Sequence, residues 1–422
     1  MISEKEYKQR RDNLVSKMSM NSTAVLFSNS YKTRSNDTSY PYRQDSNFYY
    51  MTGFKEDNSI LLLLKEKKKY KSILFINKKD KKDEMWNGKR LGVDKAKKRF
   101  LVDEIYTKDE FEKKFKEFLG SKSSLYFDFK LDYSKVKILK RYAKTLAIHK
   151  NLALLIEDMR LVKSKAEIKL IKKAVEITKL AHHKLIAMDK IDKNEYELQA
   201  SIEHTFKLNG AYNDAYTSIV AGGNSANTLH YIDNNKPLKS GELILIDAGC
   251  EYDYYASDIT RTISVNTKFT KAQKDIYSLV LNVEKKIIKM VKPGIKRTAL
   301  HKKSEKLLVK GLVKLGILEG DYKKIIKKEK HKKYYPHGIG HWLGLDVHDE
   351  CPYKDDNGNE IPLEEGMVLT IEPGIYIDKN DISVNKKYRG IGIRIEDDIL
   401  VTKEGYENLS SEIKKEIKDI EL

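Results

Sequence analysis

The stretch ELILIDAGCEYDYYASDITRTISV (242–265) places two acidic residues, Asp247 and Asp258, inside apolar, strand-like sequence. Apolar runs of this length with β-branched and aromatic residues predict strands. We expect a hairpin that turns at Tyr252 and Asp253 and brings residue 247 opposite residue 258, although this turn lacks the glycine that a tight two-residue turn prefers. Cross-strand partners have Cβ atoms about 5 Å apart. The two carboxylates should therefore be neighbours in a half-buried sheet.

Two further acids occupy similar positions in later strand-like stretches. Glu372 ends the apolar run of GMVLTIEPGIYI (366–377), and Glu396 lies in IGIRIEDDILV (391–401). The two-residue period of a strand places Arg394 on the same face as Glu396. Taken singly, each acid also fits an exposed strand edge or a structural ion pair. Taken together, close and buried like charges are costly unless something positive lies between them.

The stretch YYPHGIGHWLGLDVHD (334–349) holds three histidines, His337, His341 and His348. A single histidine among apolar residues is more often a hydrogen-bonded core residue than a ligand. Beside the four acids, however, one imidazole completes a ligand set for two divalent cations, whose charge would balance four carboxylates. Oxygen ligands with one imidazole suit Mn²⁺, Co²⁺ or Zn²⁺ rather than a thiolate-rich structural zinc site.

Two other interpretations of the histidine stretch fail. It is not the H-E-x-x-H motif of a metalloprotease, because Gly338 stands where the glutamate must be. Its glycines do not have the spacing of a dinucleotide-binding loop, and no strand precedes them. Pro336 and the glycines also argue against a helix here, so His337 and His341 need not share a helical face.

The composition is that of a folded chain with a large basic excess. The 422 residues are 40% hydrophobic and 9% aromatic, which is enough for two domains and too apolar for a disordered chain. The formal net charge is +19, but the lysines are spread along the chain, as in KKIIKKEKHKK (323–333), and are mixed with acids. We therefore expect a lysine-rich solvated surface and no nucleic-acid partner.

No membrane segment is expected. The longest apolar run, SILLLL (59–64), is far shorter than the roughly 20 residues of a membrane-spanning helix. The N-terminal residues are charged throughout and lack the apolar stretch of a signal peptide. Two cysteines, Cys250 and Cys351, do not make a disulfide framework. We expect a soluble, cytoplasmic protein with no membrane partner.

The order of helix-like and strand-like segments predicts two domains, 1–160 and 161–422. The boundary precedes Ser164 and Glu167, which form a capping box at the head of a long amphipathic helix. Alternating segments predict a small α/β domain before the boundary: strands at 23–28, 58–65 and 71–77, then helices at 108–120 and 132–147. After it, two helices followed by antiparallel strands occur twice, which predicts a larger α+β domain.

Separated motifs also follow one another in a fixed order along nearly the whole chain. Besides LIDAGCEYDYYASDITRT (245–262), they are YPYRQDSNFYYMTGF (40–54), EMWNGKRLG (84–92), TLHY (228–231), HGIGHWLGLDVHD (337–349), TIEPGIY (370–376) and GIRIEDDILVT (392–402). This set resembles the proline-specific metallopeptidases with the pita-bread fold, and among them the aminopeptidase P group. The resemblance implies a small N-terminal α/β domain and a larger C-terminal pita-bread domain of the creatinase/aminopeptidase type.

The resemblance implies a centre of two divalent metal ions. Asp247 and Asp258 would bind the first ion, and Asp258 would bridge to the second. His341 and Glu372 would complete the second ion, while Glu396 would bridge both. Manganese is the expected metal, with zinc or cobalt as alternatives.

Other residues match family positions around that centre. His230, His337 and His348 would bind substrate and take part in catalysis, and Arg394 and Tyr376 would support them. Trp86 resembles a tryptophan that lines the proline pocket of the family, either within one chain or from a neighbouring subunit. The alternative for Trp86 is an ordinary packed side chain.

The implied reaction is hydrolysis of the bond between an N-terminal residue and a penultimate proline, by a metal-bridging hydroxide. Glu372 would carry the proton to the proline nitrogen, and His230 and His348 would donate hydrogen bonds to the carbonyl oxygen. The expected partners are peptides with proline at position 2 and further copies of the chain, as a dimer or tetramer. Two alternatives stay open: a prolidase, which cuts Xaa-Pro dipeptides with the same metal motifs, and a non-catalytic pita-bread binding module.

Overall fold

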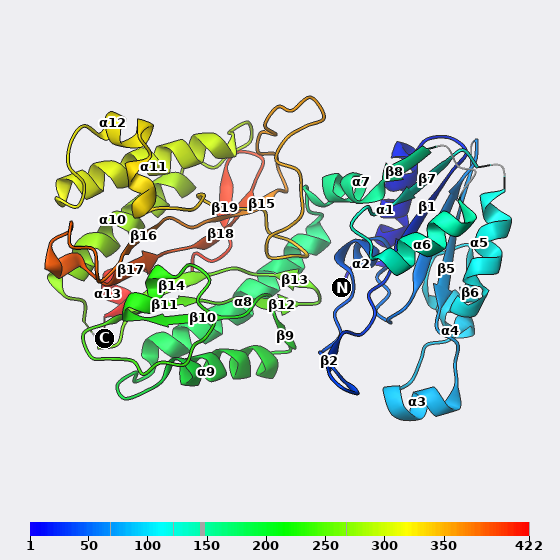
Figure 1. Cartoon of the computed structure of the whole chain (residues 1–422), viewed down its shortest axis with the longest axis horizontal. Helices are drawn as coiled ribbons and strands as arrows, with labels where there is room; N and C mark the ends of the chain where they lie inside the picture. The colour runs from blue at the N-terminus through cyan, green and yellow to red at the C-terminus, as the bar shows by residue number, and fades with distance from the viewer. Residues whose placement is uncertain (68, 121, 144–147, 267, 422) are drawn as a thin grey trace. The chain divides into compact units, whose positions relative to one another are not determined.

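The structure is a computed structural model that describes residues 1–67, 69–120, 122–143, 148–266 and 268–421. The chain divides into two compact units, Met1–Arg160 and Leu161–Leu422 (Figure 1). Among the described residues, no helix is both long enough and apolar enough to cross a membrane.

The first unit is built on one six-stranded mixed sheet. Its strand order is β6 (Glu104–Thr107), β5 (Tyr70–Ile76), β4 (Ile60–Lys65), β1 (Ser22–Phe27), β7 (Ser124–Phe127) and β8 (Ile148–Asn151). The β1–β4 and β4–β5 pairs are antiparallel, whereas β1–β7, β5–β6 and β7–β8 are parallel. A short hairpin, β2 (Thr33–Ser35) and β3 (Thr38–Ser39), stands apart from this sheet.

Helices and a 3₁₀ turn accompany the sheet of the first unit. They are α1 (Glu4–Lys17), α2 (Ser46–Thr52), α3 (Lys81–Asn87), α4 (Val93–Arg99), α5 (Phe111–Leu119), α6 (Tyr133–Tyr142), α7 (Leu152–Arg160) and the 3₁₀ turn η1 (Lys108–Glu110). Helix α5 buries Phe111, Phe115 and Leu119, spaced four residues apart, and stops at Gly120, where φ is positive. The helix expected over 132–147 ends at Tyr142, and its residues 144–147 lie outside the described part of the chain.

In the second unit, helices followed by antiparallel strands occur in two successive rounds. Helices α8 (Lys165–Ala187) and α9 (Glu195–Leu208) precede one antiparallel sheet, β10 (Ile219–Gly222), β11 (Leu243–Asp247) and β14 (Thr260–Ser264). The 3₁₀ turn η2 (Gly223–Asn227) follows β10. The capping box expected at Ser164 and Glu167 starts α8.

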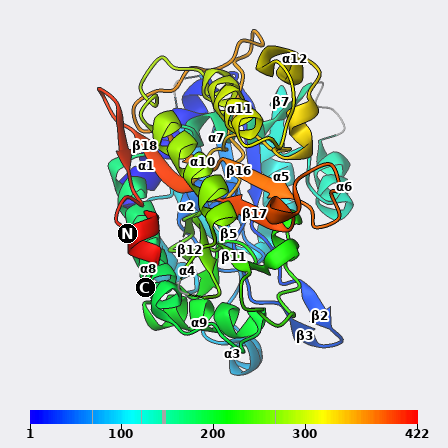
Figure 2. The same ribbon diagram turned by 90° about the vertical axis from the view of Figure 1, so that its left-hand side faces the viewer.

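The second round of elements begins with α10 (Lys271–Ile288), α11 (Arg297–Lys314), α12 (Tyr322–Lys327) and the turn η3 (Lys330–Lys333). Its strands form one sheet of β15 (Val368–Ile371), β18 (Asp397–Val401) and β19 (Tyr406–Asn408), and another of β16 (Gly374–Ile377) and β17 (Ile391–Arg394). The turn η4 (Lys386–Tyr388) and helix α13 (Ile417–Ile420) complete the unit. One apolar cluster joins α10, α11 and α13 to both rounds of strands; α10 and α11 lie in front of the strands in Figure 2.

The hairpin predicted in 242–265 is wrong in register. Strands β11 and β14 pair antiparallel with Asp247 opposite Thr260, not opposite residue 258. The chain leaves this sheet at Gly249, where a Cβ atom would lie only 1.8 Å from the carbonyl oxygen of Ser257. This close approach places Asp258 before the start of β14.

The residues between the two strands form a hairpin of their own. Strands β12 (Cys250–Tyr252) and β13 (Tyr255–Ala256) pair with each other, and β12 also pairs with β9 (Asn213–Asp214). The turn lies at Asp253 and Tyr254, one residue later than expected, and both residues have positive φ, 47° and 74°. This inserted hairpin is why the register of β11 and β14 does not follow from counting residues to a single turn.

Candidate metal centre

The second unit contains a cavity of about 390 Å³ that gathers most of the predicted site residues. It is lined by Asp247, Asp258, Glu372, Glu396, His230, His337, His341, His348 and Arg394, together with Leu229, Gly338, Gly340 and Tyr353. Tyr376 is hydrogen-bonded to two of these residues. The structure therefore brings together side chains from segments that lie far apart in the sequence.

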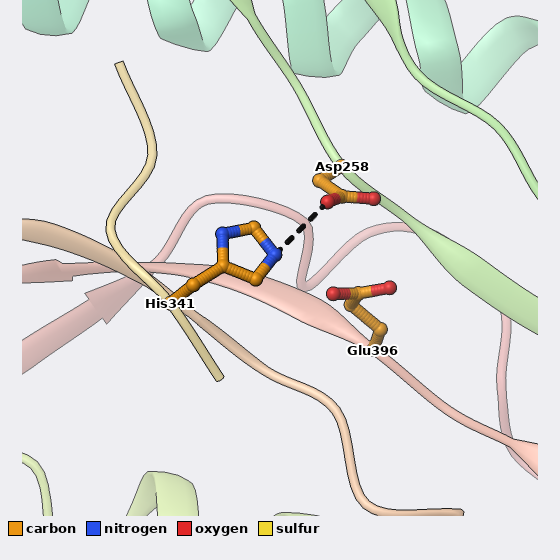
Figure 3. A group of neighbouring side chains, drawn as sticks. All are labelled: Asp258, His341 and Glu396. Carbon is orange, nitrogen blue, oxygen red and sulfur yellow. Dashed lines mark ion pairs between the residues drawn. The ribbon is translucent and has the colours of Figure 1, made fainter. Parts of the chain in front are cut away.

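Each of the four acids lies at the end of a strand. Asp247 is the last residue of β11, and Asp258 lies two residues before β14. Glu372 follows β15, and Glu396 lies between β17 and β18. Asp258, His341 and Glu396 offer ligand atoms that all lie within 4.8 Å of one another, and their side chains point toward one another in Figure 3.

His341 is held from its backbone. Its amide donates to Oγ1 of Thr370 at 3.2 Å, and its carbonyl accepts from the amide of Thr370 at 2.9 Å. At Gly340 a Cβ atom would lie 1.9 Å from the Thr370 carbonyl, so only glycine allows the loop this close to β15. Nε2 of His341 then lies 3.4 Å from Oδ2 of Asp258 and 3.9 Å from Oε1 of Glu372.

The charged groups in this cavity change one another's pKa values. Burial raises the pKa of Asp258 and of Glu396, and the neighbouring carboxylates raise both further. Burial also raises the pKa of Glu372 to about 7. For His341 burial acts to lower the pKa, but the hydrogen bond and charge of Asp258 outweigh it and raise the pKa to about 9.

Tyr216 was not among the residues expected from the sequence. Its hydroxyl lies 2.5 Å from Oδ1 of Asp247 and 2.6 Å from Oδ1 of Asp258, so it joins the two carboxylates. A phenol has one proton to donate, so Tyr216 donates to one of the two carboxylates or divides its hydrogen bond between them. No residue pattern around Tyr216 signals this contact, because it depends on a fold that brings positions 216, 247 and 258 together.

These observations fit a site for divalent cations. Close, buried carboxylates with raised pKa values need protons or cations to offset their charge. The donor set of carboxylate oxygens and one imidazole suits Mn²⁺, Zn²⁺ or Co²⁺. The chemistry of the side chains thus agrees with the metal centre that the resemblance implies.

A chain of hydrogen bonds supports one side of the cavity. Arg394 forms an ion pair with Asp247 at 2.5 Å and donates to the hydroxyl of Tyr376 at 3.0 Å. Arg394 also donates through Nε to Oγ1 of Thr260, which donates to Oε2 of Glu396 at 2.7 Å. Arg394 therefore orients two of the acids at once.

His337 continues this chain. Its Nδ1 lies 2.8 Å from the carbonyl oxygen of Gly338, and its Nε2 lies 2.8 Å from the hydroxyl of Tyr376. Burial, with the charge of Arg394 adding to it, lowers the pKa of His337 to about 3, so the ring is neutral. Because a carbonyl only accepts, Nδ1 carries the proton and Nε2 accepts from Tyr376.

The remaining histidines are more open to solvent. His230 and His348 are exposed residues that line the cavity. The ring of His348 meets that of His341 edge to face, with centroids 4.2 Å apart. Burial, with His341 and His230 adding to it, lowers the pKa of His348, so its imidazole is neutral at neutral pH and has one N–H to donate.

Trp86 belongs to the first unit. It lies on α3 and is 84% exposed, beside Met85, which is 83% exposed. It lines a polar cavity of about 930 Å³ in that unit, with Asp57, Arg90 and other residues. Trp86 is therefore largely open to solvent in the single chain, and its role stays a prediction.

Comparison with known proteins gives matches over the whole chain. The chain is 42% identical over 420 residues to the Xaa-Pro aminopeptidase of Haemophilus influenzae, covering 100% of this chain and 97% of that protein. Its fold is similar to that of Zn-substituted Escherichia coli aminopeptidase P in complex with product (39% identity, TM-score 0.95, covering 100% of this chain and 98% of that one). It is equally similar to proline aminopeptidase P II from Yersinia pestis (39% identity, TM-score 0.96, covering 100% and 99%).

Family models match both units. Residues 7–126 match the N-terminal domain of aminopeptidase P, and residues 169–403 match metallopeptidase family M24. The expected fold class, a small N-terminal α/β domain followed by a larger pita-bread domain, is confirmed by these matches and by the solved structures. The chain therefore belongs to metallopeptidase family M24, with an aminopeptidase P N-terminal domain ahead of its catalytic-type domain.

Proposed function

We propose that this chain is an Xaa-Pro aminopeptidase, which hydrolyses the bond between an N-terminal residue and a penultimate proline. One observation carries the proposal: four carboxylates and His341 meet in one cavity with His230, His337 and His348. The Xaa-Pro aminopeptidases to which the chain is similar along its whole length support this activity.

Two divalent ions would be held by Asp247, Asp258, His341, Glu372 and Glu396. Manganese is the metal we propose first, with zinc or cobalt as alternatives. When bound, such ions supply Lewis acidity, which makes water a better nucleophile at neutral pH and stabilises negative charge on the substrate carbonyl. All other steps are assigned to side chains of the chain.

Glu372 is proposed to move the proton. It lines the cavity, and a general base must lie within hydrogen-bond reach of the proton that it takes up. Its carboxylate takes a proton from the attacking water and delivers it to the proline nitrogen as the peptide bond breaks. Without this delivery the amine would leave as an anion, which is unfavourable.

His230 and His348 are proposed as hydrogen-bond donors to the carbonyl oxygen of the scissile bond. Both line the cavity and are exposed to it. Donors of this kind stabilise the charge that develops on the oxygen in the transition state, and loss of one costs about 100- to 1,000-fold in rate.

His337 has a different part in the proposal. Both of its ring nitrogens are engaged, by Gly338 and by Tyr376. It therefore holds the wall of the substrate pocket and fixes Tyr376, which in turn accepts from Arg394. Arg394 and Tyr376 orient Asp247 rather than exchange protons with substrate.

The substrate preference follows from the chemistry of proline. In the scissile bond the proline nitrogen bears no hydrogen, and the proline ring fixes φ. Enzymes that bind the substrate through a hydrogen bond from that N–H therefore lose a contact. We propose that the chain acts as a homo-oligomer, a dimer or tetramer in the cytoplasm, in which Trp86 of one copy reaches substrate in another. The 84% exposure of Trp86 supports this.

The proposal is tested by cleavage of three peptides with the purified Mn²⁺-loaded protein. We expect release of the N-terminal residue from Xaa-Pro-Yaa and no release from the matched Xaa-Ala-Yaa. The dipeptide Xaa-Pro distinguishes the alternative: turnover of the dipeptide alone would identify a prolidase. Absence of all three activities in metal-loaded protein would leave a binding module.

A further inference from the structure

A buried ion pair lies beside the metal centre without lining its cavity. Nζ of Lys163 lies 3.1 Å from Oδ2 of Asp349, and each side chain is only 1% exposed. Asp349 directly follows His348 in the sequence. Lys163 directly precedes Ser164, the residue that caps α8. Neither charge is accessible to a substrate, so the pair does not bind one.

The carboxylate of Asp349 closes the turn that carries His348. Its Oδ1 accepts from the amide of Asp346 at 3.3 Å, and its Oδ2 accepts from the thiol of Cys351 at 3.1 Å. The amide of Asp349 donates to the carbonyl of Trp342 at 2.9 Å. The backbone on both sides of His348 is thus fixed through one side chain.

The surrounding sequence makes room for this pair. A Cβ atom at Gly344 would lie 2.5 Å from Oδ2 of Asp349 and 3.0 Å from Cε of Lys163. Gly344 is therefore required where it stands, in the middle of the HWLGLDVHD stretch. Gly344 leaves space for the carboxylate of Asp349, and the thiol of Cys351 donates a hydrogen bond to that carboxylate.

The other end of the pair is tied to the strand that leads to Glu372. The amide of Lys163 donates to the carbonyl of Gly366 at 2.9 Å, and the amide of Gly366 donates to the carbonyl of Val401 at 3.0 Å. Strand β15 starts two residues after Gly366 and runs to Ile371. Lys163 consequently joins the His348 turn to the part of the sheet that presents Glu372.

Stability alone gives no reason for such a pair. Taking two charges out of water costs about as much as their attraction returns, and apolar replacements are often as stable. What a buried pair does supply is a fixed geometry, because each charge is strongly unfavourable anywhere else in the interior. His348 itself is exposed, with no hydrogen-bond partner for its ring among the described residues, so its position depends on its backbone and on its contact with His341.

We propose that the Lys163–Asp349 pair is a positioning element that holds His348 at the metal centre. The predicted effect of this pair on the rate rests on the catalytic role proposed for His348. Its predicted effect on the position of the His348 ring does not rest on that role. A misplacement of a catalytic group by about 1 Å costs on the order of 100-fold in rate. Loss of the pair should lower kcat and leave KM nearly unchanged, because a donor to the transition state contributes little to ground-state binding.

The test is a double-mutant cycle between Lys163 and His348. Lys163→Met should lower kcat about 10- to 100-fold with the metal content unchanged, and His348→Ala about 100-fold or more. In the His348→Ala background, Lys163→Met should cost less than about threefold, because its effect passes through the missing imidazole. An equal loss in both backgrounds, or loss of metal with Lys163→Met, would overturn the proposal.

Two further variants separate positioning from folding. The apolar pair Lys163→Met/Asp349→Leu should restore the stability of the fold without restoring kcat, and full recovery of kcat would contradict the proposal. Lys172→Met is the matched control, since Lys172 forms an exposed ion pair with Glu407 and should leave kcat at the wild-type value.

A second readout does not depend on activity. Lys163→Met should shift the ring C–H proton resonances of His348, identified by their loss in His348→Ala, and leave those of His149 in the first unit unchanged. Unshifted His348 resonances would overturn the proposal even in an active protein. If wild-type protein cleaves no Xaa-Pro peptide, the proposed function fails while this measurement still decides the positioning role.

Discussion

At the scale of single residues, the acids of the candidate metal centre have an uncharged partner as well as Arg394. Tyr216 touches both Asp247 and Asp258, with its hydroxyl 2.5 and 2.6 Å from their carboxylates. This hydroxyl has one proton to donate, and its contacts hold the two carboxylates side by side. Partners of metal ligands often matter for metal affinity nearly as much as the ligands.

Removing this hydroxyl tests its contribution. Tyr216→Phe should weaken Mn²⁺ binding about 10- to 100-fold, measured by calorimetric titration of the metal-free protein. The control is Tyr212→Phe, since Tyr212 is 80% exposed and its hydroxyl should not affect binding. Equal Mn²⁺ affinity of Tyr216→Phe and wild-type protein would show that the contact does not orient the ligands.

Asp214, outside the candidate metal centre, is an acid whose ionised form is destabilised by burial. Burial, with the charge of Glu203 adding to it, raises the pKa of Asp214 to about 6. In the unfolded chain the pKa is about 3.9, so the unfolded state gives up the proton first. The free energy of unfolding contributed by Asp214 therefore falls as the pH rises from about 4 to about 6 and stays low above that range.

Replacing this acid should remove the pH-dependent loss. Asp214→Asn should match the wild type at pH 4 and exceed its free energy of unfolding at pH 8 by roughly 1–2 kcal/mol, less than the full shift because the group is partly exposed. Urea unfolding followed by the fluorescence of Trp342, which is 1% exposed, measures this. A difference between variant and wild type that is the same at both pH values would rule out the assigned titration.

The candidate site shows what could be predicted about residues. The apolar surroundings of Asp247, Asp258, Glu372 and Glu396 marked them as unusual, and the structure places all four around one cavity. Their metal-binding roles stay predictions. Tyr216 had no such mark, because tyrosines are common (26 in the chain) and its importance comes only from tertiary contacts.

At the scale of elements, the register between β11 and β14 could not be predicted from the residue pattern. The strands themselves follow from their apolar residues, but their register depends on the contact of Gly249 with the carbonyl of Ser257. It depends equally on positive φ at Asp253 and Tyr254, and tyrosine, unlike aspartate, does not favour this backbone conformation. Contacts and backbone conformations of this kind depend on the tertiary structure around the strands, so local sequence does not reveal them.

The C-terminal residues around Lys415 contact elements that lie far from them in the sequence. Lys415 forms ion pairs with Glu284 of α10 and Asp397 of β18, whose side chains are fully buried. Arg261 pairs with Asp397 at 2.7 Å and donates to the carbonyls of Lys414 and Glu396. The tail therefore packs against the strand that follows Glu396.

Loss of the tail lysine should destabilise this unit. Lys415→Met leaves Glu284 without its cationic partner, and breaking a buried ion pair costs about 3 kcal/mol or more. We expect the urea midpoint to fall accordingly, again followed by Trp342. Lys418→Met, at an exposed position of α13, is the control; equal midpoints for the two variants would mean that Lys415 does not stabilise the unit.

At the scale of the whole molecule, the change of sequence character near residue 160 coincides with the end of the first compact unit at Arg160. Composition and local order indicated two units because each must bury its own apolar faces. Composition did not indicate that Trp86 and Met85 are exposed, since exposure of a large apolar residue is a property of the folded surface.

Those exposed side chains lead to a prediction about assembly. Large aromatic side chains often dominate the binding energy of an interface, so Met85→Ser/Trp86→Ala should shift the sedimenting species from dimer or tetramer toward monomer. It should also raise KM for Xaa-Pro-Yaa. The control is Tyr133→Ser, which removes another side chain that is 80% exposed; if the wild type already sediments as a monomer, the assembly prediction is wrong.

We infer that the buried acids of three distant segments are stable together because they bind a pair of divalent cations. The most direct test is elemental analysis of the purified protein at neutral pH, before and after chelation, beside Xaa-Pro-Yaa cleavage by the same samples. We predict about two divalent ions per chain. Metal and activity should be lost together on chelation and restored by Mn²⁺, and both should be absent in Glu396→Gln. Cleavage that persists in metal-free protein, or fully chelatable protein that binds no Mn²⁺, would contradict this inference.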